Sequence, residues 1–509
     1  MLSIINSFAL DGLKGYRVKV EVDINKGLPS YDVVGLADTA IKESKQRVRS
    51  AIKNSGYQFS VDKITINLAP ADTKKEGSLL DLAIAIGLLS ATGQIETENI
   101  KDIVFIGELS LDGSIRKANG VLPILISARK SGIKKIIIPK ENAKEASFTP
   151  NMEIYALEKL GDVVDFLNGE QHFEKVTTSS YEQAKRQFVS ESDFSWVKGQ
   201  SSAKRALEIA AAGGHNVLML GPPGSGKTML AKCLPTILPD MTFEEALEVT
   251  KIHSIAGCLD EKTGIVLERP FRAPHHTATT VALTGGGGKA KPGEISLAHN
   301  GVLFLDEIPE YNRHSIETLR QPLEDGTVVV ARNLRSIEYP ASFMLIASMN
   351  PCPCGNYGSK LKECKCSPAQ IHKYLNKLSG PLMDRIDLHV EVDAVSFQEI
   401  SGDINEESSE SIKSRVDSAR KIQLLRFDDK KTFSNSKMTS AMCKKYCTLD
   451  VETTKLLETA FVSLKLSARA HNRILKVART IADLEGSEKI NSEHLLEAIS
   501  YRSLDNKYW

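Results

Sequence analysis

The sequence predicts an α/β protein with an N-terminal α/β domain, a core built on a parallel sheet, and a helical C-terminal domain. The apolar run Val217–Leu220 leads directly into the glycine-rich segment Gly221–Thr228, as a buried strand leads into a phosphate-binding turn. Alternating apolar residues in Tyr16–Ile24 indicate an earlier strand, and helical periodicity dominates after Ile412. The 509 residues allow about three domains, at roughly 150 residues per domain.

The composition is that of an ordinary globular protein, with 41% hydrophobic and 25% charged residues. Lys and Arg number 65 and Asp and Glu 64, so the chain carries no global positive field for nucleic acid. Any contact with nucleic acid must come from local patches or from a ring of subunits. Eight cysteines in a chain of this length do not suggest a disulfide scaffold.

No membrane or export segment is predicted. Residues Met1–Asn6 lack a basic region, and Asp11 interrupts the apolar start, which argues against a signal peptide. The longest apolar stretch, Leu79–Leu89, contains Asp81 and Gly87 and is too short to span a bilayer. We expect a soluble, cytoplasmic protein without a membrane partner.

The first domain is expected to cover residues 1–170. Strands are predicted at Tyr16–Ile24, Lys63–Leu68, Ile103–Leu109 and Lys135–Ile138, and helices at Lys42–Lys53, Leu79–Leu89 and Val121–Lys130. Residues 171–192 are polar with weak periodicity and are predicted to be a linker.

Three segments of this domain, Lys75–Asp81, Gly107–Gly113 and Ser131–Asn142, resemble the proteolytic domain of Lon-type proteases, a ribosomal S5 domain 2-like fold. Those enzymes use a serine nucleophile with a lysine base. In this chain the nucleophile position falls on Leu79 and the lysine position on Leu122. A leucine can act neither as a nucleophile nor as a base. Ser78 lies one place off, which on a helix turns a side chain by about 100°. The resemblance therefore implies the fold without the catalytic dyad, and we do not expect a protease.

The ATPase core is expected at residues 193–395, centred on the G-x-x-x-x-G-K-[ST] pattern. Its glycines let backbone N–H groups curl around an anion. Lys227 is expected to reach the β- and γ-phosphates of ATP, and the Thr228 hydroxyl to bind Mg²⁺. The loop consists of Gly221, Pro222, Pro223, Gly224, Ser225, Gly226, Lys227 and Thr228.

Two further strands are predicted to end at the same site. The apolar run Gly301–Leu305 is followed by Asp306 and Glu307, as expected of a buried parallel strand with carboxylates at its end. Asp306 would hold Mg²⁺ and Glu307 would polarise the attacking water. The run Ser342–Met349 ends in Asn350, whose amide can orient that water.

Arg385, in the segment Ser379–Asp387, is predicted either to act as an arginine finger on the ATP of a neighbouring subunit or to form a surface salt bridge.

The phosphate-binding loop, the acidic strand end, Asn350 and Arg385, in this order along the chain, resemble the AAA+ superfamily. Arg272–Thr277, Gly285–Gly288 and Pro292–Gly301 narrow the resemblance to the magnesium-chelatase-like group.

Together with the Lon-like domain, the chain resembles the ComM/YifB family. That resemblance implies a homohexameric ring ATPase with DNA-related activity, associated with branch migration of recombination intermediates during natural transformation.

Two segments are candidates for contact with DNA, each with the alternative of an ordinary surface loop. The insertion Arg269–His299 has glycine-rich turns with Lys289 and Lys291, which suits a loop that grips phosphates. The segment Gly326–Pro340 is predicted to be a hairpin with Arg332 and Arg335 near its tip.

Four cysteines follow Asn350 closely, in two C-x-C pairs, and suit a tetrahedral Zn²⁺ site. Free thiols or a redox pair are the alternatives. Four thiolate ligands leave no open position, so the zinc would be structural. The cysteines are Cys352, Cys354, Cys364 and Cys366.

Residues 396–509 are expected to form a helical lid, with helices at Ile412–Phe427, Val451–Ser463, Ser467–Leu484 and Ser492–Ser500. By resemblance Arg469 is the second sensor, reaching ATP from the lid. Arg473 lies one turn later on the same helix face and stays an alternative.

The leading hypothesis is an ATP-driven DNA motor, either a helicase or a branch-migration factor that acts in DNA uptake and transformation. The alternative is a magnesium-chelatase-type motor subunit that remodels a protein and has no DNA activity. The Lon-like domain and the cysteine insert weigh against the alternative, because such a subunit needs neither.

Overall fold

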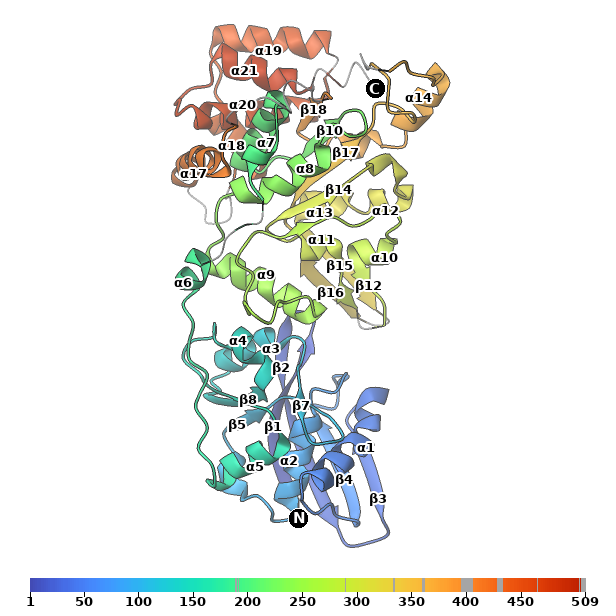
Figure 1. Cartoon of the computed structure of the whole chain (residues 1–509), viewed down its shortest axis with the longest axis vertical. Coiled ribbons are helices and arrows are strands. Elements are labelled where there is room, and N and C mark those ends of the chain that lie inside the picture. The colour runs from blue at the N-terminus through green and yellow to red at the C-terminus, as the bar shows by residue number, and fades with distance from the viewer. Residues whose placement is uncertain are drawn as a thin grey trace. The chain divides into compact units, whose positions relative to one another are not determined.

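The computed structural model of the chain is shown in Figure 1. It describes residues 1–187, 190, 192–288, 290–332, 335–358, 362–394, 406–427, 434–464, 466–502 and 504. The contacts between residues divide the chain into two compact units. Unit 1 comprises Met1–Phe188 and Phe243–Leu267, and unit 2 comprises Val189–Thr242 and Glu268–Trp509. The predicted α/β class, the parallel sheet and the helical C-terminal region are confirmed.

Unit 1 is built on a seven-stranded sheet with the order β3-β4-β2-β1-β5-β8-β9. The long strands β1 and β2 pair antiparallel from Leu2↔Asp23 to Asp11↔Lys14, whereas β5, β8 and β9 are parallel. The strands are β1 (Leu2–Asp11), β2 (Lys14–Asn25), β3 (Ser30–Val34), β4 (Lys63–Ala69), β5 (Ile103–Phe105), β8 (Lys135–Pro139) and β9 (Glu153–Leu157).

Helices cover both faces of this sheet. Along β8 the side chain of Ile137 packs into one apolar cluster and those of Ile136 and Ile138 into another, as the alternation of a strand requires. Helix α2 is buried at every residue, and with α1 it fills the first cluster, whereas α3 fills the second. The helices are α1 (Thr39–Asn54), α2 (Asp81–Ala91), α3 (Val121–Lys130), α4 (Ala143–Ala146) and α5 (Leu160–Asn168).

The predicted strand Ile103–Leu109 is wrong in its extent, because the chain leaves the sheet after Phe105. Gly107 N donates to Leu79 O at 3.0 Å, and Leu82 N donates to Gly107 O at 3.0 Å, so the backbone turns to meet the start of α2. A Cβ on Gly107 would lie 2.5 Å from Ile115 Cγ2. The continuation is a separate small hairpin, β6 (Glu108–Leu109) with β7 (Ile115–Arg116).

The two positions of the Lon-type dyad lie in apolar surroundings. Leu122 is buried within α3, and Leu79 packs against the apolar cluster of that helix. The hydroxyl of Ser78 donates to the carboxylate of Glu108. The buried amine of Lys75 donates to Pro70 O.

The predicted linker, residues 171–192, contains the short helix α6 (Tyr181–Arg186). Ser180 caps this helix, because its Oγ accepts from Gln183 N at 3.5 Å. The ring of Tyr181 is buried and lies 5.6 Å, centroid to centroid, from that of Phe243. This part of the segment is therefore ordered against unit 1.

Helix α9 (Phe243–Ala256) comes from the sequence range of the ATPase core but folds with unit 1. Gly120 N, at the start of α3, donates to Ser254 O at 3.2 Å and to Ser254 Oγ at 3.0 Å. The buried carboxylate of Glu145 accepts from Leu122 N at 3.0 Å, from Asn142 Nδ2 at 3.0 Å and from Ser254 Oγ. Burial raises the pKa of Glu145, although these donors act in the opposite direction.

Unit 2 contains a five-stranded sheet with the order β11-β14-β17-β10-β18, in which every pairing is parallel. The carboxyl ends of all five strands therefore share one edge. Helix α7 (Ser201–Gly213) packs beside β18, and its buried residues belong to the core of this unit. The strands are β10 (Val217–Leu220), β11 (Phe271–Arg272), β14 (Val302–Leu305), β17 (Met344–Met349) and β18 (Leu388–Glu391).

Smaller elements surround this sheet. The predicted hairpin is confirmed as β15 (Thr327–Arg332) paired with β16 (Arg335–Pro340), and a second one joins β12 (Gly285–Gly286) to β13 (Lys291–Pro292). The short helices are α8 (Lys227–Cys233), α10 (Thr280–Thr284), α11 (Glu294–Leu297), α12 (Arg313–Glu317), α13 (Arg320–Asp325), α14 (Pro368–Leu375) and α15 (Gly380–Met383).

In the C-terminal region, helices α17, α19, α20 and α21 match the four predicted helices to within three residues at each end, whereas α18 was not predicted. Ser467 caps α20, because its Oγ accepts from Ala470 N at 3.2 Å. Cys443 and Cys447 are buried in the core of unit 2. No helix in the described ranges is long and apolar enough to cross a bilayer. The helices are α17 (Ser409–Arg426), α18 (Ser440–Tyr446), α19 (Val451–Ser463), α20 (Ala468–Leu484) and α21 (Ser492–Ser500).

We expect Ser254→Ala to lower the free energy of unfolding by about 1–3 kcal/mol, because it removes a donor from a buried carboxylate. Urea unfolding followed by fluorescence measures the effect. Ser131→Ala is the control, since the Ser131 hydroxyl is exposed and donates to a backbone carbonyl of its own helix. Equal stability of the two variants would contradict a stabilising role for the Glu145–Ser254 contact.

Candidate active site

The loop Gly221–Thr228 connects β10 to α8 at the carboxyl edge of the sheet. Gly224 and Gly226 have φ angles of +78° and +89°, and nothing lies within 4 Å of where their Cβ atoms would be. A Cβ on Gly221 would lie 2.1 Å from Val392 O. The loop is therefore an open cradle whose backbone shape and packing both require glycine.

Lys227 is folded back into this cradle and is 8% exposed. Its Nζ donates to Gly221 O at 2.7 Å and to Pro222 O at 2.9 Å, and lies 3.4 Å from Asn350 Oδ1. Burial lowers the pKa of Lys227, whereas the charges of Asp306 and Glu307 act in the opposite direction. The sequence-predicted lysine, amide and loop are thus brought together.

Asp306 lies beside the loop because β14 and β17 pair in parallel, with Leu305 opposite Ala347. Its Oδ2 accepts from Thr228 Oγ1 at 2.8 Å, and its Oδ1 accepts from Ser348 Oγ. Oxygen ligands of this kind are the ones that Mg²⁺ prefers. Thr228 and Asp306 could therefore hold the ion, whose positive charge would neutralise phosphate oxygens.

Ser348 is a site residue that the sequence reasoning missed. Its hydroxyl donates to Asp306 and accepts from Glu307 N at 3.1 Å, so it fixes both acidic residues. The available signal is a lone hydroxyl in an otherwise apolar strand, two residues before Asn350 and hence on the same side of the strand.

Glu307 has a left-handed backbone with φ +50°, which is uncommon for a residue other than glycine. Such conformations persist where the surrounding structure holds them, often at functional sites. Here the Glu307 backbone is held by Ser348, and its side chain is exposed. An exposed carboxylate directly after Asp306 can accept a proton from a water molecule.

Arg385 and Arg469 belong to a second group of side chains. Arg385 Nη1 donates to Pro381 O at 2.7 Å and Nη2 pairs with the carboxylate of Glu324. Arg469 is 64% exposed and its Nη1 lies 3.8 Å from Asp384 Oδ2. Within the described residues, no hydrogen bond or ion pair joins either arginine to the loop, Asp306, Glu307 or Asn350 of the same chain.

Arg473 is committed to a different contact. Its Nη1 donates to the buried Asp387 Oδ1 at 2.7 Å, and Asp387 Oδ2 lies 3.2 Å from His215 Nδ1. Burial alone would raise the pKa of Asp387, but Arg473 and His215 hold it well below its usual range. Of the two arginines on α20, Arg469 is thus the one whose side chain is mostly exposed.

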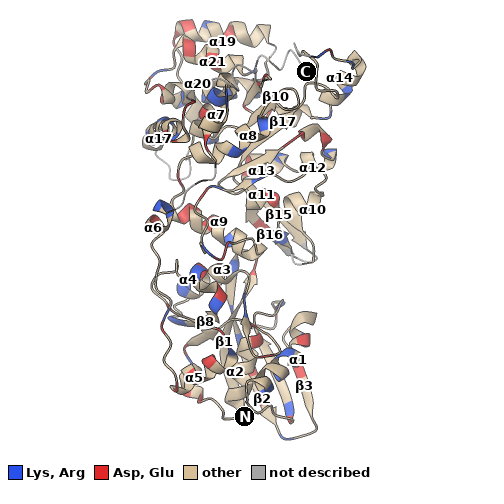
Figure 2. Ribbon diagram, in the orientation of Figure 1, with Lys and Arg blue, Asp and Glu red and all other residues tan. Residues whose placement is uncertain are grey.

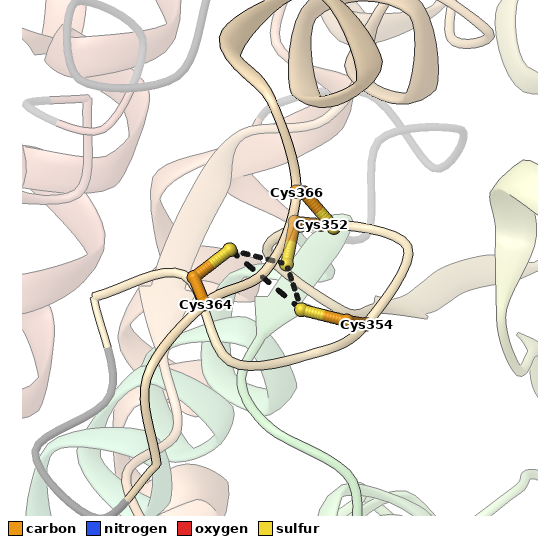
Figure 3. A group of neighbouring side chains, drawn as sticks. All are labelled: Cys352, Cys354, Cys364 and Cys366. Atoms are coloured by element: carbon orange, nitrogen blue, oxygen red, sulfur yellow. Dashed lines mark hydrogen bonds between the residues drawn. The ribbon is translucent and has the colours of Figure 1, made fainter.

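The four cysteines after Asn350 converge in space (Figure 3). The sulfur of Cys352 lies 3.4 Å from that of Cys354 and 3.7 Å from that of Cys364, and Cys354 and Cys364 are 3.6 Å apart. All four sulfur atoms, including that of Cys366, lie within 4.8 Å of one another. A Zn–S bond of about 2.3 Å gives tetrahedral edges of about 3.8 Å, so the cluster fits that geometry.

This cysteine loop adjoins the phosphate-binding loop. Gly355 has φ +78°, and a Cβ there would lie 2.5 Å from Pro223 Cδ. Tyr357 N donates to Cys352 Sγ at 3.3 Å, and backbone donors at Asn356 and Lys365 lower the pKa of Cys354 to about 6. A cluster that is two residues from Asn350 and packs on Pro223 can fix two parts of the site at once.

Three family models match most of the chain. Residues 193–400 match the family described as magnesium chelatase, subunit ChlI. Residues 20–142 match subunit ChlI of Mg-chelatase, and residues 406–502 match its C-terminal part.

Two individual relatives match almost the full length of the chain. The chain is 44% identical to the competence protein ComM of Haemophilus influenzae over 508 residues, which covers 99% of this chain and 98% of that protein. It is 44% identical to the uncharacterized protein YifB of Escherichia coli over 509 residues, which covers 99% of this chain and 97% of that protein. It is also 25% identical to the Lon protease of Rhizobium meliloti over 175 residues, covering 32% and 22%.

We expect Ser348→Ala to lower either the affinity for Mg²⁺ or the rate of ATP hydrolysis by about 10–100-fold. The reason is that the variant lacks a residue that orients a metal-binding carboxylate. Titration of the ATPase rate with Mg²⁺ measures this. Ser342→Ala, just before the same strand, is the control. If both variants match the unaltered protein, Ser348 does not position Asp306.

Proposed function

The chain belongs to the ComM/YifB family of magnesium-chelatase-like AAA+ ATPases, and we propose that it is an ATP-driven motor that moves DNA strands. The activity proposed is that of a helicase or branch-migration factor acting on recombination intermediates. Family membership supports ATP hydrolysis, and the name of its Haemophilus influenzae relative, a competence protein, supports a link to DNA uptake.

The observation that carries the ATPase part is the meeting of Lys227, Thr228, Asp306, Glu307 and Asn350 at one sheet edge. In the proposed mechanism, Lys227 leaves its backbone carbonyls to contact the β- and γ-phosphates, and Thr228 and Asp306 hold Mg²⁺. Glu307 orients and deprotonates the attacking water, and Asn350 holds that water by a hydrogen bond.

The remaining groups of the site would come from a second copy of the chain. Arg385 and Arg469 contact other residues than the phosphate-binding loop of their own chain. We propose that both act on the ATP of the neighbouring subunit, which requires a ring, and that the ring is a homohexamer. For Arg469 this specifies which subunit's ATP the predicted second sensor reaches.

Two hairpins are the proposed DNA contacts. Tyr339 OH on β16 donates to Ala290 O beside β13 at 2.9 Å, so both hairpins form one assembly. Lys291 is exposed; Lys289 and the side chains of Arg332 and Arg335 lie outside the described residues. Figure 2 shows acidic and basic residues interspersed along both units, so local loops, and not the overall charge, would hold the phosphates.

We also propose that Cys352, Cys354, Cys364 and Cys366 hold a structural Zn²⁺. The support is the near-tetrahedral spacing of their sulfur atoms and the backbone donor at Tyr357. Zinc would brace the segment between Asn350 and α14 without a part in the chemistry. The contact of Gly355 with Pro223 would carry that rigidity to the phosphate-binding loop.

The motor is tested with synthetic forked and four-way DNA. We expect the unaltered protein to move the branch only with ATP. Lys227→Ala should be inactive, and Glu307→Gln should bind ATP but hydrolyse it about 10²–10⁴-fold more slowly, because the proton acceptor is lost. Glu310→Gln is the control, an exposed carboxylate on the same loop that pairs with Lys377.

Branch movement by Lys227→Ala equal to that of the unaltered protein would refute an ATP-driven mechanism. ATP hydrolysis that neither single-stranded nor branched DNA stimulates would favour the alternative, a motor that remodels a protein partner. Normal turnover by Glu307→Gln would show that Glu307 has another role.

For the zinc site, elemental analysis of the reduced protein should find one zinc per chain. We expect Cys364→Ser to lose the metal and to raise the KM for ATP about 10-fold, because the loop beside Pro223 is released. Cys258→Ser, at an exposed free cysteine, should change neither. A reduced, active protein without zinc would end this proposal.

A further inference from the structure

The guanidinium of Arg385 is occupied in the single chain. Nη1 donates to Pro381 O at 2.7 Å, Nη2 pairs with Glu324, and 14% of the side chain is exposed. An arginine that stabilises the γ-phosphate of a neighbouring subunit must present its guanidinium to that phosphate. The contact with Glu324 therefore competes with the role proposed for Arg385.

Glu324 lies where several cations converge. It is on α13, and its side chain is 63% exposed. Its carboxylate has a lowered pKa, caused first by Arg385 and then by Arg469 and Arg320. Arg320, Glu324 and Arg385 line one hollow of about 550 Å³. A carboxylate and a phosphoryl group can each present two oxygen acceptors to one guanidinium, so Glu324 occupies a place suited to an incoming phosphate.

The backbone that carries the two arginines is fixed, so only side chains can exchange. Asn216 Nδ2 donates to Arg385 O at 2.8 Å, and Asn216 Oδ1 accepts from Leu345 N at 2.8 Å. One turn after Arg469, Arg473 donates to Asp387. The segments of Arg385 and Arg469 are thus held to the same sheet and to each other, whereas the Glu324 side chain is exposed and can turn away.

We propose that Glu324 is a positioning residue. It holds Arg385 by an ion pair in the unassembled chain and releases it to contact the γ-phosphate of ATP on a second copy of this chain. The proposal rests on the proposed function, in which Arg385 acts between subunits. The ion pair is exposed on its Glu324 side, and ion pairs open to solvent are weak, so a bound triphosphate on the neighbour can displace Glu324. ATP-loaded neighbours would then assemble productively, and isolated chains would keep the arginine covered.

The test measures ATP hydrolysis per chain over a series of protein concentrations, with the oligomeric state followed by sedimentation velocity. We expect Glu324→Gln to lower the concentration of half-maximal activity by about fivefold, the effect of one exposed ion pair, with the plateau rate unchanged. Asp325→Asn, exposed on the same helix and lining the same hollow, should leave both values unchanged. In an Arg385→Ala background, Glu324→Gln should no longer lower the concentration of half-maximal activity.

Two results would overturn the positioning role: an unchanged concentration dependence in Glu324→Gln, or a plateau that falls as it does in Arg385→Ala. A thermal unfolding midpoint equal to that of the unaltered protein shows that the variants fold. Full activity of Arg385→Ala at every concentration would instead refute the action of Arg385 between subunits. Loss of activity in Arg385→Ala with no change in Glu324→Gln would refute the role of Glu324 alone.

Discussion

The buried carboxylate of Asp387 is the contact on which the arrangement of unit 2 depends. It accepts from Arg473 of the helical region at 2.7 Å and from Asn216 N at 3.3 Å, and it lies 3.2 Å from His215, just before β10. Burying a carboxylate is costly unless it is paired and hydrogen-bonded, and removal of one partner leaves an uncompensated charge. Asp387 therefore connects helix α20, the segment that carries Arg385 and the strand that precedes the phosphate-binding loop.

Much of the site could be predicted because its residues follow strands whose direction the sequence reveals. Lys227 and Asn350 are 123 residues apart in the sequence. They and Asp306 nevertheless meet, because parallel strands share their carboxyl edge. The contacts that could not be predicted join residues of no recognisable pattern. Ser348 is a single hydroxyl in an apolar run, and Glu145 meets Ser254 across 109 residues. Strand β1 was also missed, because its central residues are buried on both faces and show no alternation.

Apolar periodicity tells which face of a helix is buried but not what covers it, and this limit applies to α9. Its sequence position lies inside the ATPase core, and its packing against α3 follows from a hydrogen bond to Gly120 and the carboxylate of Glu145. The same limit applies to Arg469 and Arg473. The spacing of both arginines fits the predicted second sensor, and only their surroundings distinguish them. Arg473 forms an ion pair with the buried Asp387, whereas the Arg469 side chain is mostly exposed.

The excursion of residues 243–267 into unit 1 makes the two units inseparable by a single cut. The chain passes between them near residue 188, near 242 and near 267, so cleavage in the first connection leaves them joined by two others. A fragment that starts at residue 189 would still carry α9, with the buried side chains of Ala246, Val249 and Ile252 deprived of their partner. Exchange of the N-terminal unit between relatives would therefore have to transplant α9 as well.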